Sequence, residues 1–247
     1  TSTAGMLGAT ERGPESPRLV TSWLDFQRWY GGYMPQISFL AYAIRGFFDN
    51  GGQRCFVGRV VADGTLTTAG AVGNLNISAI GRGEWGNNIM VKVDHATKRD
   101  VDVGHDWFRL SILYFTNPPE SADFVDPTSS DPADLANSKR REPDVLEVYD
   151  NLTDAAGANN NVVTIVNVNS RLVRVAWNNA AGPAPLPVQS FQNLGDNGTN
   201  GEIDANDYFG DLNAIPGSPD PDEELLGRGR GLSAFATIDE ISLLLVP

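Results

Sequence analysis

The stretch AIRGFFDNGGQRCFVGRV, residues 43–60, is predicted to hold the end of a helix, a turn and a strand. Apolar side chains recur at helical spacing through its first half and just before it. This stripe consists of Ile37, Leu40, Ala41, Ile44, Phe47 and Phe48. The spacing predicts one buried helix face that ends in the two phenylalanines. We expect Asn50, Gly51 and Gly52 to form a left-handed cap, and Gly46 to permit close approach of a neighbouring element.

The residues on either side of this helix continue the pattern. Ser22 with Asp25 three positions later is typical of a helix start, and Gly31 is typical of a helix end. Pro35 suits the first turn of the following helix. Residues 55–61 are apolar on both alternating faces, which predicts a strand covered on both sides. The first part of the chain therefore reads as strand, helix, helix, strand.

Beyond residue 61 the chain becomes richer in glycine, threonine, asparagine and serine. Residues 88–93 and 108–114 alternate between apolar and polar positions, which predicts two strands paired as a hairpin. Residues 116–143 hold many prolines and acids and are expected to form an exposed excursion. Residues 162–177 fit either a short helix followed by a strand or two strands. Residues 241–246 are expected to form a last, buried strand.

Composition excludes several classes of partner. The chain of 247 residues has a formal net charge of -13, so we expect neither nucleic acid nor an anionic membrane to bind it. Its one cysteine rules out an internal disulfide, which fits folding in a reducing compartment. No apolar run reaches the length that crosses a membrane.

Two glycine-rich segments partly match known ligand-binding motifs. GRGEWG, residues 81–86, has the spacing of a dinucleotide-binding turn, but a strand pattern follows it where that site requires a helix. We therefore expect a turn with Trp85 packed inward. DNGTNGEIDAND, residues 196–207, partly fits a calcium loop, although Gly198 and Asp207 occupy positions that need better ligands. A calcium-dependent β-rich binding module remains an alternative function on this ground.

Acids and histidines gather in one predicted hairpin loop. They are Asp94, His95, Asp100, Asp102, His105 and Asp106. The group could supply metal ligands, but a charged loop explains it equally well. Ser233 in GLSAF lacks the second glycine of a nucleophile elbow, which argues against a catalytic serine. An α/β-type hydrolase that uses Ser233 and a histidine is the second alternative function. Cys55 lies in a predicted buried strand, where a thiol is inert. We therefore predict a protein that is not an enzyme, with no catalytic residue, no cofactor and no metal ligand.

Several blocks of the sequence resemble, in order, the tail sheath proteins of contractile phages and related contractile injection systems. The most specific block runs from the predicted helix through DNGG into the strand at residues 40–60. Others are GMLGATERGP, LVTSWLDFQRWYGG, GRGEWGNNIMVKV, NSRLVRV, GTNGEIDANDYFG and GLSAFATIDEISLLLVP. The resemblance therefore extends over nearly the whole chain.

The resemblance implies a structural protein of a virion tail or phage-like particle, assembled in the bacterial cytoplasm. Sheath subunits associate with one another as stacked hexameric rings in a helical sleeve around an inner tube. Baseplate and terminator proteins bind the two ends of the sleeve. The sleeve contracts and drives the tube through a target envelope, while extended arms add strands to neighbouring subunits.

The resemblance also implies a mixed α/β fold, with a discontinuous α/β sheath core and an inserted, mainly antiparallel β domain. Residues 1–61 would form the first part of the core and residues 62–224 the inserted β-rich outer region. Residues 225–247 would return to the core. We expect the natural protein to continue beyond both ends of this sequence, with an N-terminal arm and a tube-proximal C-terminal domain.

Overall fold

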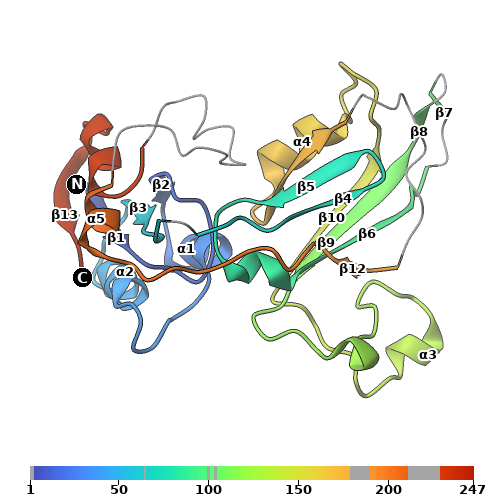
Figure 1. Cartoon of the computed structure of the whole chain (residues 1–247), viewed down its shortest axis with the longest axis horizontal. Coiled ribbons are helices and arrows are strands. Elements are labelled where there is room, and N and C mark those ends of the chain that lie inside the picture. Colours follow the sequence, from blue (N-terminus) through green and yellow to red (C-terminus); the bar gives the residue numbers. More distant parts are fainter. Residues whose placement is uncertain (1–2, 64, 99–100, 103–104, 179–189, 211–228) are drawn as a thin grey trace. The chain divides into compact units, whose positions relative to one another are not determined.

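The computed structural model describes residues 3–63, 65–98, 101–102, 105–178, 190–210 and 229–247, which form two compact units (Figure 1). Unit 1 comprises Thr1–Thr68, Ala79–Gly86 and Asn197–Pro247, and unit 2 comprises Ala69–Ser78 and Asn87–Asp196. Helices accompany several sheets whose strand pairs are mostly antiparallel, which confirms the predicted mixed α/β class. No helix in the described residues has the length and apolar character needed to span a membrane.

Unit 1 is built on a four-stranded sheet with the order β13-β1-β3-β2. The strands are β1 (Thr3–Gly8), β2 (Arg18–Val20), β3 (Cys55–Arg59) and β13 (Ile241–Leu245). β1 runs parallel to both of its neighbours, and every residue of β1 and β3 is buried. The prediction of a β3 covered on both sides is therefore confirmed.

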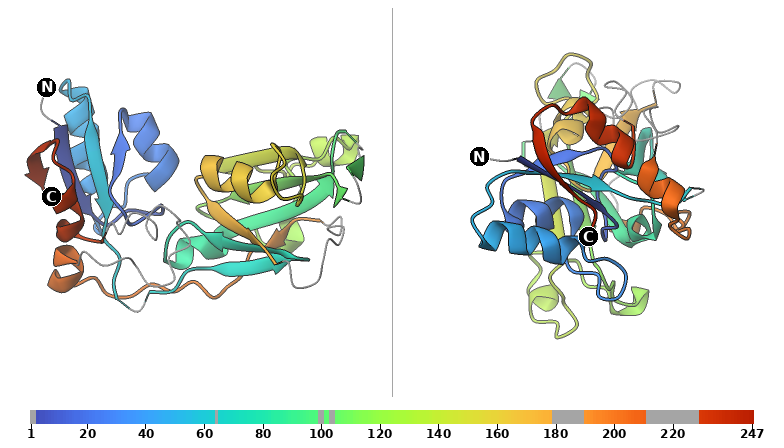
Figure 2. Two further views of the ribbon diagram at one scale, coloured as in Figure 1. Left: turned by 90° about the horizontal axis from the view of Figure 1, so that it is seen from above. Right: turned by 90° about the vertical axis from the view of Figure 1, so that its left-hand side faces the viewer.

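Helices cover both faces of this sheet (Figure 2). α1 (Trp23–Tyr30) and α2 (Leu40–Asp49) lie on one side, where a Cβ at Gly8 would come within 3.2 Å of Leu40. The 3-10 helix η4 (Leu232–Thr237) lies on the other, where a Cβ at Gly58 would come within 2.9 Å of the Phe235 ring. Glycines at these two strand positions let the helices approach the sheet closely.

The predicted start and end of α1 are confirmed. The Ser22 hydroxyl accepts the Asp25 N–H at 3.1 Å, and the Asp25 carboxylate accepts the Thr21 N–H at 3.3 Å. The first contact satisfies a backbone donor that the first helical turn leaves without a partner, and the second binds the residue before the N-cap to the same turn. Gly31 ends the helix with φ 87°, a left-handed conformation that favours glycine.

α2 begins later than the sequence predicts. Pro35 lies in a turn in which Gln36 has φ 67° and the Ile37 N–H donates to the Met34 carbonyl at 3.1 Å. Ile37 is 70% exposed, so its place in the buried stripe was wrong. Leu40, Ala41 and Ile44 are buried as predicted. The prolyl residue sets a turn at this point, and the helix begins only after the turn closes.

The end of α2 combines a confirmed cap with two corrections. Gly51 has φ 88°, and the Gly52 N–H donates to the Phe47 carbonyl at 2.8 Å, as expected of a left-handed cap. Phe47 and Phe48 are half-buried rather than buried, with their rings edge-to-face at 5.3 Å. No neighbour lies within 4 Å of a Cβ placed at Gly46, so the close approach expected there was wrong. A Cβ at Gly52, in contrast, would overlap the Phe47 ring.

These two glycines give a matched pair of substitutions. Gly52→Ala should lower the free energy of unfolding by about 1–3 kcal/mol, because the Phe47 ring must move away from the new methyl group. Gly46→Ala should raise it by about 0.5–1 kcal/mol, because alanine favours the helix interior and meets no neighbour. Chemical denaturation of both variants measures the difference. Equal effects of the same sign would contradict the packing of Phe47 on Gly52.

Unit 2 contains the antiparallel sheet β10-β9-β6-β12. Its strands are β6 (Ile89–His95), β9 (Phe108–Tyr114), β10 (Val145–Leu152) and β12 (Gln192–Asn193). β6 and β9 pair from Ile89 with Tyr114 to His95 with Phe108, which confirms the predicted hairpin. The short strands β7 (Val101–Asp102) and β8 (His105–Asp106) pair within the intervening loop.

A second sheet in unit 2 has the order β11-β5-β4. Its strands are β4 (Ala69–Val72), β5 (Leu75–Ala79) and β11 (Val173–Trp177), and β11 follows the helix α4 (Val162–Asn169). Of the two alternatives for residues 162–177, the helix followed by a strand is therefore correct. Asn161 caps α4 by accepting the N–H groups of Val163 and Thr164 at 3.0 and 3.2 Å.

The remaining short helices lie in connecting segments. They are η1 (Glu84–Asn88), η2 (Ser121–Asp123), α3 (Pro132–Leu135) and α5 (Ala205–Phe209). η1 begins within the glycine-rich residues 81–86, β6 follows η1 directly, and Trp85 is 7% exposed. The expected turn with an inward Trp85 is confirmed.

A buried ion pair joins two distant segments of unit 1. Arg82 donates to both carboxylate oxygens of Glu15, at 2.7 and 2.5 Å, and the Glu15 side chain is 3% exposed. Arg59 of β3 donates to the carbonyls of Gly13 and Arg82, at 3.2 and 2.8 Å. A bidentate pair with added backbone contacts satisfies charges that would be costly if they were buried alone.

Candidate assembly interface

The most exposed apolar strand of unit 1 is β13 at the edge of its sheet. Leu243 is 49% exposed, Leu244 44% and Val246 52%, although they belong to a nearly continuous apolar run. The prediction of a buried last strand was therefore wrong. Within the described residues β13 pairs only with β1, so its outer edge has no neighbouring strand.

The inner side of β13 is fixed firmly. Ile241 and Leu244 approach β1 at Gly5, where a Cβ would lie 3.1 to 3.2 Å from their side chains. Just before the strand, Glu240 forms an ion pair with Arg54 at 2.8 Å. β13 is thus held in place along one edge while the other edge is available. An uncovered apolar edge strand is a template for pairing with another chain.

The opposite edge of the same sheet, formed by β2, is less suited to pairing with another strand. β2 has only three residues, and the Arg18 guanidinium lies over the Trp29 ring, 3.6 Å from its centroid. A short edge strand that carries a charged residue is a poor template for pairing. The geometry therefore favours β13 as the assembly edge of unit 1.

A second apolar surface surrounds the turn before α2. Phe39 is 69% exposed, and Tyr33 and Tyr42 stack with ring centroids 4.5 Å apart. Tyr33 also stacks on Trp23 at 5.1 Å. Sequence reasoning missed this surface, because it began the helix at Pro35 and placed Ile37 on the buried face, and it made no assignment for Tyr33, Phe39 and Tyr42. The aromatic density of residues 23–42 was the signal that could have indicated it.

Two of the residues considered for calcium binding, Asp204 and Asp207, form a capping box at the start of α5. Asp204 accepts the N–H groups of Asn206 and Asp207 at the start of α5, at 2.7 and 3.2 Å. Asp207 is 7% exposed and accepts the N–H groups of Asp63 and Asp204, at 2.9 and 2.8 Å. In the part of the chain that the structure describes, no three His, Cys, Asp or Glu residues gather in a metal-binding arrangement.

Among the residues that the structure describes, the other candidate catalytic and metal-binding residues do not come together as an active site. The Ser233 hydroxyl donates to the Phe209 carbonyl at 2.9 Å, so its proton is directed to the backbone rather than to a base. His95 is exposed, and the Asp94 carboxylate beside it forms an ion pair with Lys92 at 3.3 Å. Asp100 and the side chains of Asp102, His105 and Asp106 lie outside the described residues.

Cys55 is completely buried in β3, and burial raises the pKa of its thiol to about 12. The thiolate is the nucleophilic form, so the folded protein should keep this group unreactive at pH 8. We expect no reaction with a thiol-specific disulfide reagent under native conditions and one equivalent of reaction in denaturant. Rapid native labelling would show that β3 is open to solvent.

Comparison with known proteins gives a limited result. No protein-family model and no curated protein matches the chain. The solved structures that are similar to it include a sheath tail protein from Desulfitobacterium hafniense and one from Listeria innocua. The first is 16% identical, with 84% of this chain and 38% of that chain covered, at a TM-score of 0.42. The second is 14% identical, with 84% and 36% covered, at a TM-score of 0.43. The chain thus spans less than half of either protein.

Proposed function

We propose that the chain is part of a structural subunit of a contractile tail sheath. The observation that carries this proposal is the open apolar edge of β13, because such an edge suits strand exchange between subunits. The ordered sequence blocks that resemble sheath proteins give the same assignment. The similarity to the solved sheath tail proteins is too low to support this assignment, since the TM-scores are 0.42 and 0.43.

In this proposal, copies of the subunit associate as stacked hexameric rings in a helical sleeve around an inner tube. Contraction of the sleeve drives the tube through a target envelope, and baseplate and terminator proteins bind its ends. The protein belongs to a virion tail or phage-like particle and is assembled in the bacterial cytoplasm. It performs no enzymatic reaction.

The domain boundaries also remain a proposal. Residues 1–61 and 225–247 would belong to the sheath core, and residues 62–224 to an inserted outer region. The parallel pairing of β1 with both β3 and β13 supports a core made from the two ends of this sequence. The antiparallel sheets of unit 2 support a β-rich insertion.

A charge on the open edge tests the assembly role of β13. Leu243→Lys, in the protein encoded by the complete reading frame, should abolish sheath-like polymers, because a lysine on an edge strand opposes pairing. Its thermal transition should stay close to that of the parent, since Leu243 is 49% exposed.

The matched control is Val168→Lys on α4, where the side chain is 74% exposed. This variant should polymerise normally in negative-stain images. Normal polymers from Leu243→Lys would remove β13 from the assembly interface.

Residues 1–247 alone should be monomeric at micromolar concentration and form no tubes. The resemblance places the main strand-exchanging arms outside this sequence, and a net charge of -13 opposes association at low salt. The complete reading frame should form ordered polymers under the same conditions. Light scattering and electron microscopy of both proteins make the comparison. Long sleeves from residues 1–247 would show that other contacts suffice.

A further inference from the structure

Residues 116–143 of unit 2 form a loop whose two ends meet. It connects β9 to β10, which are neighbours in the sheet, with Tyr114 paired to Val145. At its base the Thr116 N–H donates to the Asp144 carboxylate at 2.7 Å, and the Asp144 N–H donates to the Tyr114 carbonyl at 2.9 Å. The loop, called the strap below, is therefore closed at its base, beside the paired strands β9 and β10.

Contacts inside the strap give it a shape of its own. The Asp126 carboxylate accepts both the N–H and the hydroxyl of Thr128, each at 2.7 Å. Arg140 donates to the Pro127 carbonyl at 2.7 Å, and Lys139 pairs with Asp123. Two residues of the basic triplet 139–141 are thus held by the strap itself, and the strap is a folded segment rather than an unstructured connection.

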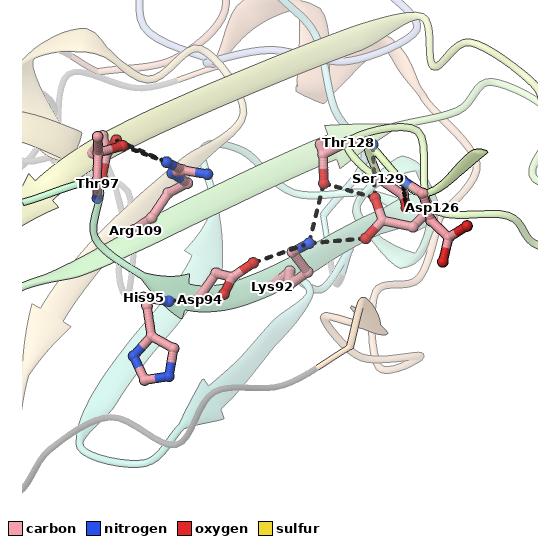
Figure 3. Close-up of polar contacts among 10 residues, drawn as sticks. Lys92, Asp94, His95, Thr97, Arg109, Asp126, Thr128 and Ser129 are labelled. Carbon is pink, nitrogen blue, oxygen red and sulfur yellow. Dashed lines mark hydrogen bonds and ion pairs between the residues drawn. The ribbon is translucent and has the colours of Figure 1, made fainter. Parts of the chain in front are cut away.

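One lysine of the sheet fastens the strap (Figure 3). The Lys92 ammonium on β6 donates to Asp126 at 2.8 Å and to Thr128 at 3.1 Å, and it lies 3.3 Å from Asp94. The Lys92 side chain is only 11% exposed. Burial alone would raise the pKa of Asp126, but the bonds from Lys92 and Thr128 lower it and keep the carboxylate charged.

An aromatic contact lies beside this ion pair. The Phe124 ring of the strap packs edge-to-face on Phe191, with centroids 5.9 Å apart. Lys92 lies 5.4 Å from the centroid of the same Phe191 ring. Lys92 is therefore the described residue at which the charged and the aromatic contacts of the strap converge.

The strap lies on the sheet face opposite α4. Directly opposed residues of antiparallel strands point to the same face, so Val148, Ser111 and Lys92 form one row across β10, β9 and β6. The neighbouring position Glu147 points to the other face, where it accepts the Ser170 hydroxyl at 2.6 Å just after α4. Ser111 is 1% exposed, whereas Val148 at the edge of the same row is 48% exposed.

We propose that the strap is a fastened cover that opens as a unit on its base at Thr116 and Asp144 while the sheet stays folded. Opening uncovers a sheet face that is continuous with the exposed side chains of Leu146 and Val148. This conformational device is independent of the proposed sheath function, because all its contacts lie within unit 2.

Limited trypsin digestion of Lys92→Met tests the proposal. Cleavage after the basic residues 139–141 should be about tenfold faster than in the parent, because a hydrogen-bonded charge that holds the strap is lost. Binding of a dye specific for exposed apolar surface should increase in parallel. The thermal transition of the protein should keep its cooperativity, since the substitution changes a side chain and leaves the backbone pairing of β6 with β9 in place.

Two further variants make the result decisive. Lys98→Met also removes a lysine, but Lys98 is exposed and bonds to Asn151 through its backbone N–H, so cleavage should stay at the parental rate. Asp126→Asn keeps an oxygen for Thr128 but removes the charge facing Lys92, and cleavage should accelerate by a smaller factor. Unchanged cleavage in both Lys92→Met and Asp126→Asn would overturn the proposal. So would loss of the whole cooperative transition in Asp126→Asn.

Discussion

Parallel pairing of β1 with both β3 and β13 is the interaction on which unit 1 depends. Ala4 lies between Cys55 and Leu243, and Met6 lies between Val57 and Leu245. The sheet is therefore complete only after the chain has passed through unit 2 and returned. Loop-closure entropy grows slowly with length, so the long excursion adds little cost beyond that of a shorter one. This explains how a large β-rich unit can be inserted in the sequence between two strands that are neighbours in the sheet.

The buried Glu15–Arg82 pair fixes an earlier return of the chain to unit 1, at residues 79–86. Arg82 belongs to a segment that follows strands of unit 2, yet its guanidinium is held in unit 1 by a carboxylate near the start of the chain. Apolar burial gives most of the driving force, but it is tolerant of shifts. A bidentate charged contact has a fixed geometry and fixes the position of the returning segment.

Local signals in the sequence predicted the local structure well. Ser22 and Gly31 marked the ends of α1, and the alternation around residues 88–114 marked the β6–β9 hairpin. Ile37 and β13 were misread for a common physical reason. Periodicity reports which side chains are apolar, but it does not report whether another element covers them. The Lys92–Asp126 contact had no local signal at all, because its partners are separated by 34 positions and only the tertiary fold brings them together.

The closed base of the loop at Thr116 and Asp144 has an evolutionary consequence. Because the two ends are joined by hydrogen bonds, residues can be added or removed between them without a change in the strands on either side. Selection could therefore alter the length, charge or composition of this segment among related chains while the sheet is conserved. The same property makes the segment a suitable place to insert an epitope or a small reporter domain.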